Sequence, residues 1–186
     1  MPKLRCNNRL QLTNMGKKGQ TIIFYGHGKG KTSAAIGTAI RSIQAGRKVA
    51  FLQFIKGNWI TNEEKFLSRQ DNIKFVKFGA GFVRNKKSIK HKKAFLKGIG
   101  RAVEILENNK YDLVVLDEIL TGLELGLISS REIELLLSKK PLALDLVLTG
   151  RKATKKIVEL SDTASEIKKI KHIFDNKVLA KKGLDF

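Results

Sequence analysis

The chain has 186 residues, of which 42% are hydrophobic, and this is enough material for one domain with a buried core. Its net charge of +20 comes from 37 Lys and Arg against 17 Asp and Glu. A single cysteine excludes an intramolecular disulfide, and no apolar run approaches the ~20 residues that cross a bilayer, so we expect a cytoplasmic protein without a membrane partner.

The chain opens with a basic, polar stretch that differs from the rest. Residues 1–18 lack the apolar segment of a secretory signal, so we interpret them as an N-terminal arm that is mobile or associated with a dimer. No internal repeat or low-complexity linker divides the remainder. We therefore expect a single domain over residues 19–186.

The segment TIIFYGHGKGKTS, residues 21–33, has the layout of a phosphate-binding loop (P-loop). Glycines let backbone N–H groups approach phosphate oxygens closely, and the following helix adds a favourable dipole. Lys31 can reach the outer phosphates, and the Thr32 hydroxyl can ligate an accompanying Mg²⁺. We predict that the residues of this loop bind ATP: Gly26, His27, Gly28, Lys29, Gly30, Lys31, Thr32 and Ser33.

Two alternatives compete with this interpretation. Tyr25 stands where the strict pattern has glycine, so the segment could be a plain glycine-rich turn between a strand and a helix. The alternate glycines also resemble a dinucleotide fingerprint, but that pattern spaces its third glycine differently and needs no Lys-Thr pair. Triphosphate binding is the favoured interpretation.

Strand and helix patterns alternate along the chain. Continuous or alternating apolar runs predict strands at 22–24, 48–54, 73–78, 111–117, 142–149 and 166–170. Helical spacing predicts a helix after the loop that stops at Gly46, and further helices at 88–108, 129–138 (with Ser130 as N-cap) and 154–160. This alternation predicts an α/β fold, in which helices cover both faces of a parallel sheet and ligands bind at the carboxyl ends of the strands.

A second set of chemical groups follows an apolar strand at 113–116, which ends in Asp117 and Glu118. An acid in this place lies beside a phosphate-binding loop and handles Mg²⁺ directly or through water, although Asp117 could instead cap the next helix. Glu118 could orient water in an ATP hydrolase or hold the metal in a transferase. We predict Thr32, Asp117 and Glu118 as the metal site, and Lys31 and Glu118 as catalytic residues.

Three further segments are expected near this edge of the sheet. Residues 53–57 end the second predicted strand, and residues 149–151 end another, where Arg151 could neutralise a phosphate or remain a surface charge. The C-terminal run from residue 162 has neither a clean helical nor a clean strand period. We expect it to pack across the sheet or over a site.

The positive charge also raises the possibility of nucleic-acid binding. Residues 84–97 carry seven Lys or Arg and no acid. Lysines outnumber arginines 28 to 9, however, and no base-reading module is visible. We interpret the excess as solvated lysine faces and do not expect a nucleic-acid partner.

Taken together, these segments resemble the P-loop type of ATP:corrinoid adenosyltransferase over residues 19–186. The resemblance rests on GHGKGKTSAAIGTAIR, VAFLQFIKGNW, GAGF, VVLDEI, LVLTGR and the closing DTASE…KHIFDNKVLAKKGLDF. It implies a RecA-like sheet, usually a homodimer, that binds Mg-ATP and a corrinoid reduced to Co(I), with a reducing flavoprotein as partner. Cobalt(I) would attack the 5′ carbon of the ribose and triphosphate would leave, in adenosylcobalamin synthesis or salvage.

The chain departs from the family pattern at two places. His27 stands where the family usually has Asn, and Phe82 is followed by Val83-Arg84-Asn85 where the family has Thr, Trp and an acid. Through the resemblance, Phe82 and Arg84 become the expected corrinoid contacts. Two other functions stay open at this point, a RecA-like ATPase stimulated by nucleic acid and a nucleotide-binding regulatory protein with an impaired second site.

Overall fold

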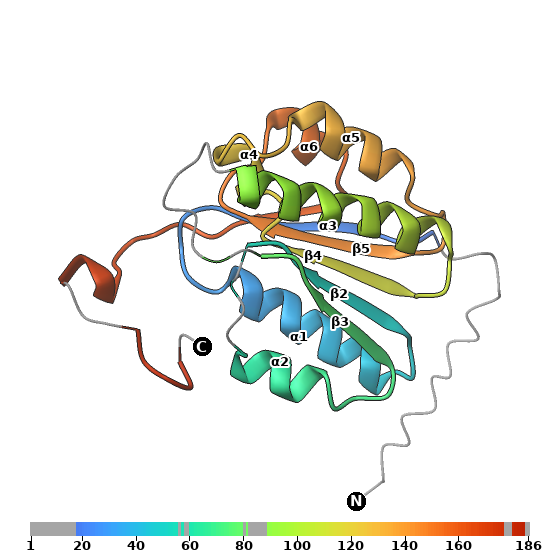
Figure 1. Ribbon diagram of the computed structural model, residues 1–186, viewed down its shortest axis with the longest axis horizontal. Coiled ribbons are helices and arrows are strands. Elements are labelled where there is room, and N and C mark those ends of the chain that lie inside the picture. Colours follow the sequence, from blue (N-terminus) through green and yellow to red (C-terminus); the bar gives the residue numbers. More distant parts are fainter. Residues whose placement is uncertain are drawn as a thin grey trace, which may run out of the picture.

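Six parallel strands form the centre of the computed structural model, which describes residues 18–55, 57, 60–79, 81, 89–176 and 180–184 (Figure 1). The strands are β1 (Thr21–Tyr25), β2 (Val49–Gln53), β3 (Ile73–Lys77), β4 (Leu113–Asp117), β5 (Asp145–Gly150) and β6 (Thr163–Glu166). They lie in the order β3-β2-β4-β5-β1-β6, and every pairing is parallel. The predicted α/β class is confirmed.

Helices cover both faces of this sheet. They are α1 (Lys31–Gln44), α2 (Asn62–Leu67), α3 (Ile89–Glu107), α4 (Thr121–Glu124), α5 (Ser130–Ser138) and α6 (Lys155–Glu159), followed by a 3₁₀ turn, η1 (Ile173–Asn176). Figure 1 shows α1 and α2 on one face and α3, α5 and α6 on the other. Within the described ranges, no helix is both long and apolar enough to cross a bilayer.

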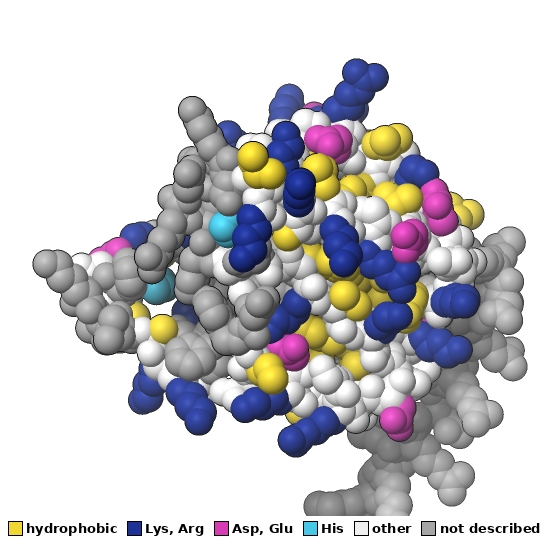
Figure 2. All heavy atoms as spheres, viewed as in Figure 1, with side chains coloured by type: hydrophobic (Ala, Val, Ile, Leu, Met, Phe, Trp, Pro, Cys, Tyr) yellow, Lys and Arg dark blue, Asp and Glu magenta, His cyan; other side chains and the backbone are white. Residues whose placement is uncertain are grey.

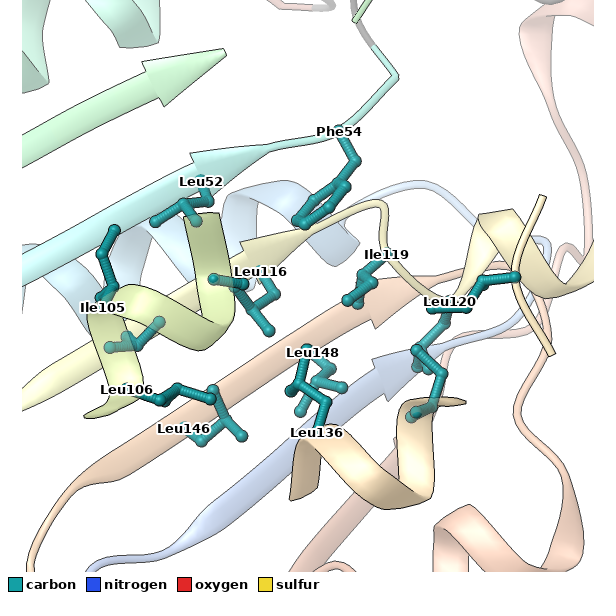
Figure 3. Packing of buried hydrophobic residues seen from close by; sticks show 14 of the residues in the cluster. Leu52, Phe54, Ile105, Leu106, Leu116, Ile119, Leu120, Leu136, Leu146 and Leu148 are labelled. Atoms are coloured by element: carbon teal, nitrogen blue, oxygen red, sulfur yellow. The ribbon is translucent and has the colours of Figure 1, made fainter. Parts of the chain in front are cut away.

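The core has two layers because side chains alternate across a strand. In β4, Val114 and Leu116 pack with residues of α3 and α5, whereas Leu113 and Val115 pack with residues of α1. Figure 3 shows the first layer, in which leucines of β2, β4 and β5 meet the apolar faces of α3 and α5. Burial on both faces explains why the central strands read as continuous apolar runs.

Lys and Arg side chains are spread over the face seen in Figure 2, and acids are fewer there. The cations lie around small apolar patches of the surface. The long helix α3 contributes Lys90, Lys92, Lys93 and Lys97 to the basic segment that the sequence analysis singled out.

The structure corrects two predicted strand boundaries. β5 begins at Asp145 rather than residue 142, because residues 141–144 form a turn in which Leu144 N donates to Pro141 O at 3.2 Å. The last strand is Thr163–Glu166, not 166–170. Among the described strands it lies at the edge of the sheet and pairs with β1 alone, and its side chains are largely exposed, so it carries no hydrophobic pattern that a sequence could reveal.

Helix starts also differ from the predictions. The N-cap of α5 is Ser129 rather than Ser130, because Ser129 accepts from Glu132 N while the Glu132 carboxylate accepts from Ser129 N, which is a complete capping box. The short helices α2 and α4 were not predicted, since neither is long enough to show a helical period. The predicted corrinoid contacts Phe82 and Arg84, and the arm up to residue 17, lie outside the described residues.

Candidate functional site

The carboxyl ends of β1, β4 and β5 bring the predicted site together. The loop after β1 and the acids at the end of β4 flank the end of β5, which lies between these two strands in the sheet. Parallel strands place all their carboxyl ends at one edge, so residues far apart in sequence converge there. The Thr32 hydroxyl thus donates to Asp117 Oδ1 at 3.0 Å across 85 residues of chain.

The loop itself is shaped by close backbone contacts. A Cβ at Gly26 would lie 2.5 Å from the carbonyl oxygen of Ile167, and one at Gly28 would lie 2.7 Å from the same oxygen. Gly28 N donates to that oxygen at 2.7 Å, and Lys31 Nζ donates to Gly28 O at 2.7 Å. The segment after β6 therefore packs on the loop, as the sequence analysis expected for the C-terminal run.

The start of α1 can present backbone donors. Gly30, its N-cap, has φ +116 and no side-chain cap in the described structure. The first amides of a helix have no partner within the helix, and their dipoles favour an anion. Lys31, Thr32 and Ser33 occupy these first positions, which fits the predicted phosphate contacts.

Asp117 is fully buried and accepts hydrogen bonds from three side chains. Thr32 Oγ1 and Thr149 Oγ1 donate to its Oδ1 at 3.0 and 2.7 Å, and Gln53 Nε2 donates to its Oδ2 at 3.0 Å. The carboxylate therefore binds groups from the loop, β2 and β5, and its helix-capping alternative is not observed, since α4 has no side-chain cap in the described structure. Because Thr32 donates its proton to Asp117, its oxygen lone pairs are left for another partner.

Glu118 adopts an unusual backbone conformation, with φ +65, which costs a non-glycine residue on the order of 1 kcal/mol or more. Two threonines hold it there. Glu118 N donates to Thr149 Oγ1 at 2.8 Å, and the Thr121 hydroxyl donates to the Glu118 carboxylate. Backbone strain at a cavity edge is typical of functional positions.

The ionisable groups of the site change one another's pKa values. Burial, and then the nearby charge of Asp117, raise the pKa of Glu118, while the Thr121 hydrogen bond and the Lys31 and Arg151 charges oppose that rise. Burial also lowers the pKa of Lys31, an effect that Glu118 opposes and Arg151 reinforces. Both pKa shifts have burial as their largest cause, because burial disfavours the charged form of each side chain.

Residues of the loop line two cavities. The first has a volume of about 410 Å³ and is lined by Lys29, Gly30, Lys31, Thr32, Ser33, Ile36, Asn62, Glu63, Glu118, Gly183 and Leu184. The second, of about 420 Å³, is lined by Tyr25, Gly26, His27, Glu124, Arg151, Lys152, Ala153 and Glu166. The structure therefore groups most predicted loop residues with Glu118, and places Gly26, His27 and Arg151 at the neighbouring cavity.

The donor set fits a magnesium ion that arrives with phosphates. The described residues contain no cluster of three or more His, Cys, Asp or Glu that could hold a metal alone. Mg²⁺ is commonly held by one or two protein oxygens together with substrate phosphates and water. Thr32 and Glu118 supply oxygen atoms at the first cavity, and Asp117 lies directly behind Thr32.

Sequence reasoning missed three polar residues of this site. Gln53 and Thr149 lie in segments that the sequence predicts at this edge without a role for either residue, and no pattern points to Thr121. Gln53 and Thr149 are fully buried polar residues at the ends of apolar strands, and this position was the available signal. Thr121 gave no such signal, since it follows the acids in a short helix.

Comparison with known proteins finds similarity along nearly the whole chain. The family model described as "ATP:corrinoid adenosyltransferase BtuR/CobO/CobP" matches residues 17–186. The chain is 34% identical to a corrinoid adenosyltransferase of Escherichia coli K12, over 91% of this chain and 87% of that protein. It is 33% identical to the corrinoid adenosyltransferase CobA of Salmonella typhimurium, with the same coverage, and 31% identical to one from Sinorhizobium sp, over 99% of this chain and 88% of that protein.

Proposed function

The chain belongs to the ATP:corrinoid adenosyltransferase family, and we propose that its loop at residues 26–33 and the acids after β4 form the ATP site of that activity. The enzyme transfers the adenosyl group of ATP to a corrinoid, a reaction of cobalamin biosynthesis. The observation that supports this site most strongly is the hydrogen bond from Thr32 to Asp117, which joins the loop to the acid at 3.0 Å.

In this proposal the loop holds the triphosphate of ATP. The first amides of α1 and the Lys31 ammonium group would face phosphate oxygens, and Arg151 would add positive charge from the neighbouring cavity. Thr32 and Glu118 would hold Mg²⁺, while Asp117 would act through Thr32 and through water. When bound, the metal neutralises negative charge on the phosphates.

The reaction needs positioning more than proton transfer. A corrinoid carrying Co(I) provides both electrons for the new cobalt–carbon bond at the 5′ carbon of the ribose. The bond from that carbon to the phosphate oxygen breaks, and the electron pair leaves with triphosphate. The residues of the loop would stabilise the departing polyanion, which is where Lys31 contributes to the rate.

Several finer features are part of the same proposal. We expect Phe82 and Arg84 to contact the corrinoid, a reducing flavoprotein to supply electrons, and a cytoplasmic homodimer to be the working form.

The decisive experiment is anaerobic incubation of the protein with Mg-ATP and chemically reduced cobalamin. The expected result is a light-sensitive spectrum typical of a cobalt–carbon bond, together with one triphosphate for each corrinoid converted. ADP and phosphate as products would instead indicate an ATPase, and an unchanged nucleotide would indicate a binding protein. Adding nucleic acid to the same assay tests the alternative of a stimulated ATPase.

A further inference from the structure

The side chain of Gln53 has an unusual position for a core residue. It lies at the last residue of β2, is fully buried, and donates from Nε2 to Asp117 Oδ2 at 3.0 Å. Its other amide atom, Oε1, is buried and has no hydrogen-bond partner in the described structure. An unsatisfied buried acceptor is costly, so a retained one calls for an explanation.

The orientation of this amide follows from its neighbour. An ionised carboxylate only accepts hydrogen bonds, so the NH₂ group of Gln53 has to face Asp117 and the oxygen has to face the other way. Flipping the amide would place two acceptors against each other. The unpartnered atom is therefore the oxygen, and the partner it lacks is a donor.

The backbone fixes the amide in this place. Gln53 is paired in register with Asp117, its carbonyl accepts from Phe78 N at 2.8 Å, and Phe54 N donates to Asp117 O at 3.1 Å. The main chain at Gln53 is thus held by both neighbouring strands, and its side chain is held by Asp117. Its oxygen is attached to the same carbon as the nitrogen that binds Asp117, so it is held beside the carboxylate that handles the metal.

A donor of the right kind would come with the substrate. Mg²⁺ keeps several of its waters when it binds through phosphates, and those waters are strong hydrogen-bond donors that need acceptors. Asp117 Oδ1 is already occupied by Thr32 and Thr149. The remaining acceptors for such a water are Asp117 Oδ2 and the unpartnered Oε1 of Gln53.

We propose that Gln53 is a positioning residue whose amide oxygen accepts a hydrogen bond from a water bound to the Mg²⁺ of Mg-ATP. The proposal rests on the proposed function for the ATP site. It assigns a second task to β2: besides forming the sheet, its last side chain orients the hydrated metal and keeps Asp117 in place.

The test compares ATP binding with and without the metal. Calorimetric titrations of ATP in Mg²⁺ and in EDTA are carried out on the wild type, on Gln53→Met and on Gln70→Met, a control at a partly exposed glutamine after α2. Gln53→Met should weaken Mg-ATP binding by about tenfold and leave metal-free ATP within about twofold, as expected for one lost charge-assisted hydrogen bond. An equal loss for both forms of ATP, or no loss, would overturn the proposal.

A second variant separates the acceptor from the donor. Gln53→Glu keeps an oxygen in the Oε1 position but replaces the NH₂ group that binds Asp117 with a second oxygen, which places two carboxyl groups against each other; its Mg-ATP affinity is therefore read relative to its own affinity for metal-free ATP. If the acceptor matters, Gln53→Glu should retain Mg-ATP binding better than Gln53→Met does. Equal weakening in the two variants would mean that only the contact with Asp117 matters, and the proposal would fail.

A measurement on the wild type covers the case in which the variants do not fold. The side-chain amide resonances of Gln53 in a ¹⁵N-labelled sample should shift on adding Mg-ATP and not on adding ATP with EDTA. Unchanged resonances with Mg-ATP would contradict the proposal. Adenosylation by the wild type is followed in parallel, so a protein that binds Mg-ATP but forms no cobalt–carbon bond would contradict the proposed function and not the role of Gln53.

Discussion

Acidic residues lie at both edges of the sheet, but different groups hold them there. At the amino edge, carboxylates accept from backbone N–H groups of neighbouring strands: Asp145 from Gln20 at 2.6 Å, Asp162 from Thr21 at 2.8 Å and Asp112 from Lys48 at 2.8 Å. At the carboxyl edge, Asp117 and Glu118 are held instead by side chains of Thr32, Gln53, Thr121 and Thr149.

One acid at each edge shows the difference. At the amino edge, the hydrogen bond from the Thr21 N–H lowers the pKa of Asp162. At the carboxyl edge, burial raises the pKa of Glu118. The first arrangement stabilises the fold, whereas the second withdraws charge from water, as is common at functional sites. Variants at the two edges should therefore change different measured quantities.

The largest effect is expected at the loop. Lys31→Ala should reduce the adenosylation rate by at least an order of magnitude, because contacts of ~1.5–3 kcal/mol each with the triphosphate are lost. The melting temperature should stay close to that of the wild type, since Lys31 makes only one hydrogen bond within the described chain. Full activity with an unchanged apparent ATP affinity would remove the loop from the mechanism.

Glu118→Gln should act chiefly through magnesium. It keeps the size of the side chain and removes the charge that a hard cation prefers, so the Mg²⁺ concentration for half-maximal activity should rise about tenfold. A magnesium titration checks this, and excess metal should restore part of the activity. Normal Mg-ATP binding without any rescue would give Glu118 another role.

Thr149 links both acids and should affect stability and activity together. Thr149→Val removes the donor to Asp117 and the acceptor for Glu118 N, which should lower the free energy of unfolding by about 1–3 kcal/mol and the rate several-fold. Thr149→Ser retains the hydroxyl and serves as the matched control. Equal behaviour of the two variants would exclude the hydroxyl as the reason.

Replacing an acidic residue at the amino edge should leave the adenosylation rate unchanged. Asp145→Asn breaks the 2.7 Å ion pair with Arg47 but keeps an oxygen for Gln20 N. Since both side chains are partly exposed, the cost should be about 0.5–1 kcal/mol of unfolding free energy, and less at high salt. Denaturant unfolding at two salt concentrations measures it, and a loss of activity without a loss of stability would contradict the comparison.

The smallest effect concerns pH. Because the folded-state pKa of Asp162 is lowered, its contribution to stability is present above its ordinary pKa and is lost as the pH falls through the lowered value. Asp162→Asn should therefore be slightly less stable than the wild type near neutral pH and equal to it in acid. A stability difference that grows on acidification would show that another group is responsible.

The sequence by itself determined the parts of this protein that have a local signature. The phosphate-binding loop, the buried strands and the acids after β4 could all be predicted, because glycine spacing, continuous apolar runs and a Lys-Thr pair lie within a few consecutive residues. The carboxyl-edge position of residues 53–57 and 149–151 also followed, since parallel strands share their direction.

Only the tertiary structure decided how these parts meet. The unpartnered oxygen of Gln53, the positive φ of Glu118 and the packing of Ile167 on the loop all depend on contacts between segments up to about 140 residues apart in sequence. The exposed edge strand β6 was misplaced for the same reason, because its position comes from pairing with β1 and not from its own side chains. Hydrophobic periodicity records which face of an element is buried, but a hydrogen bond between distant side chains leaves no period in the sequence.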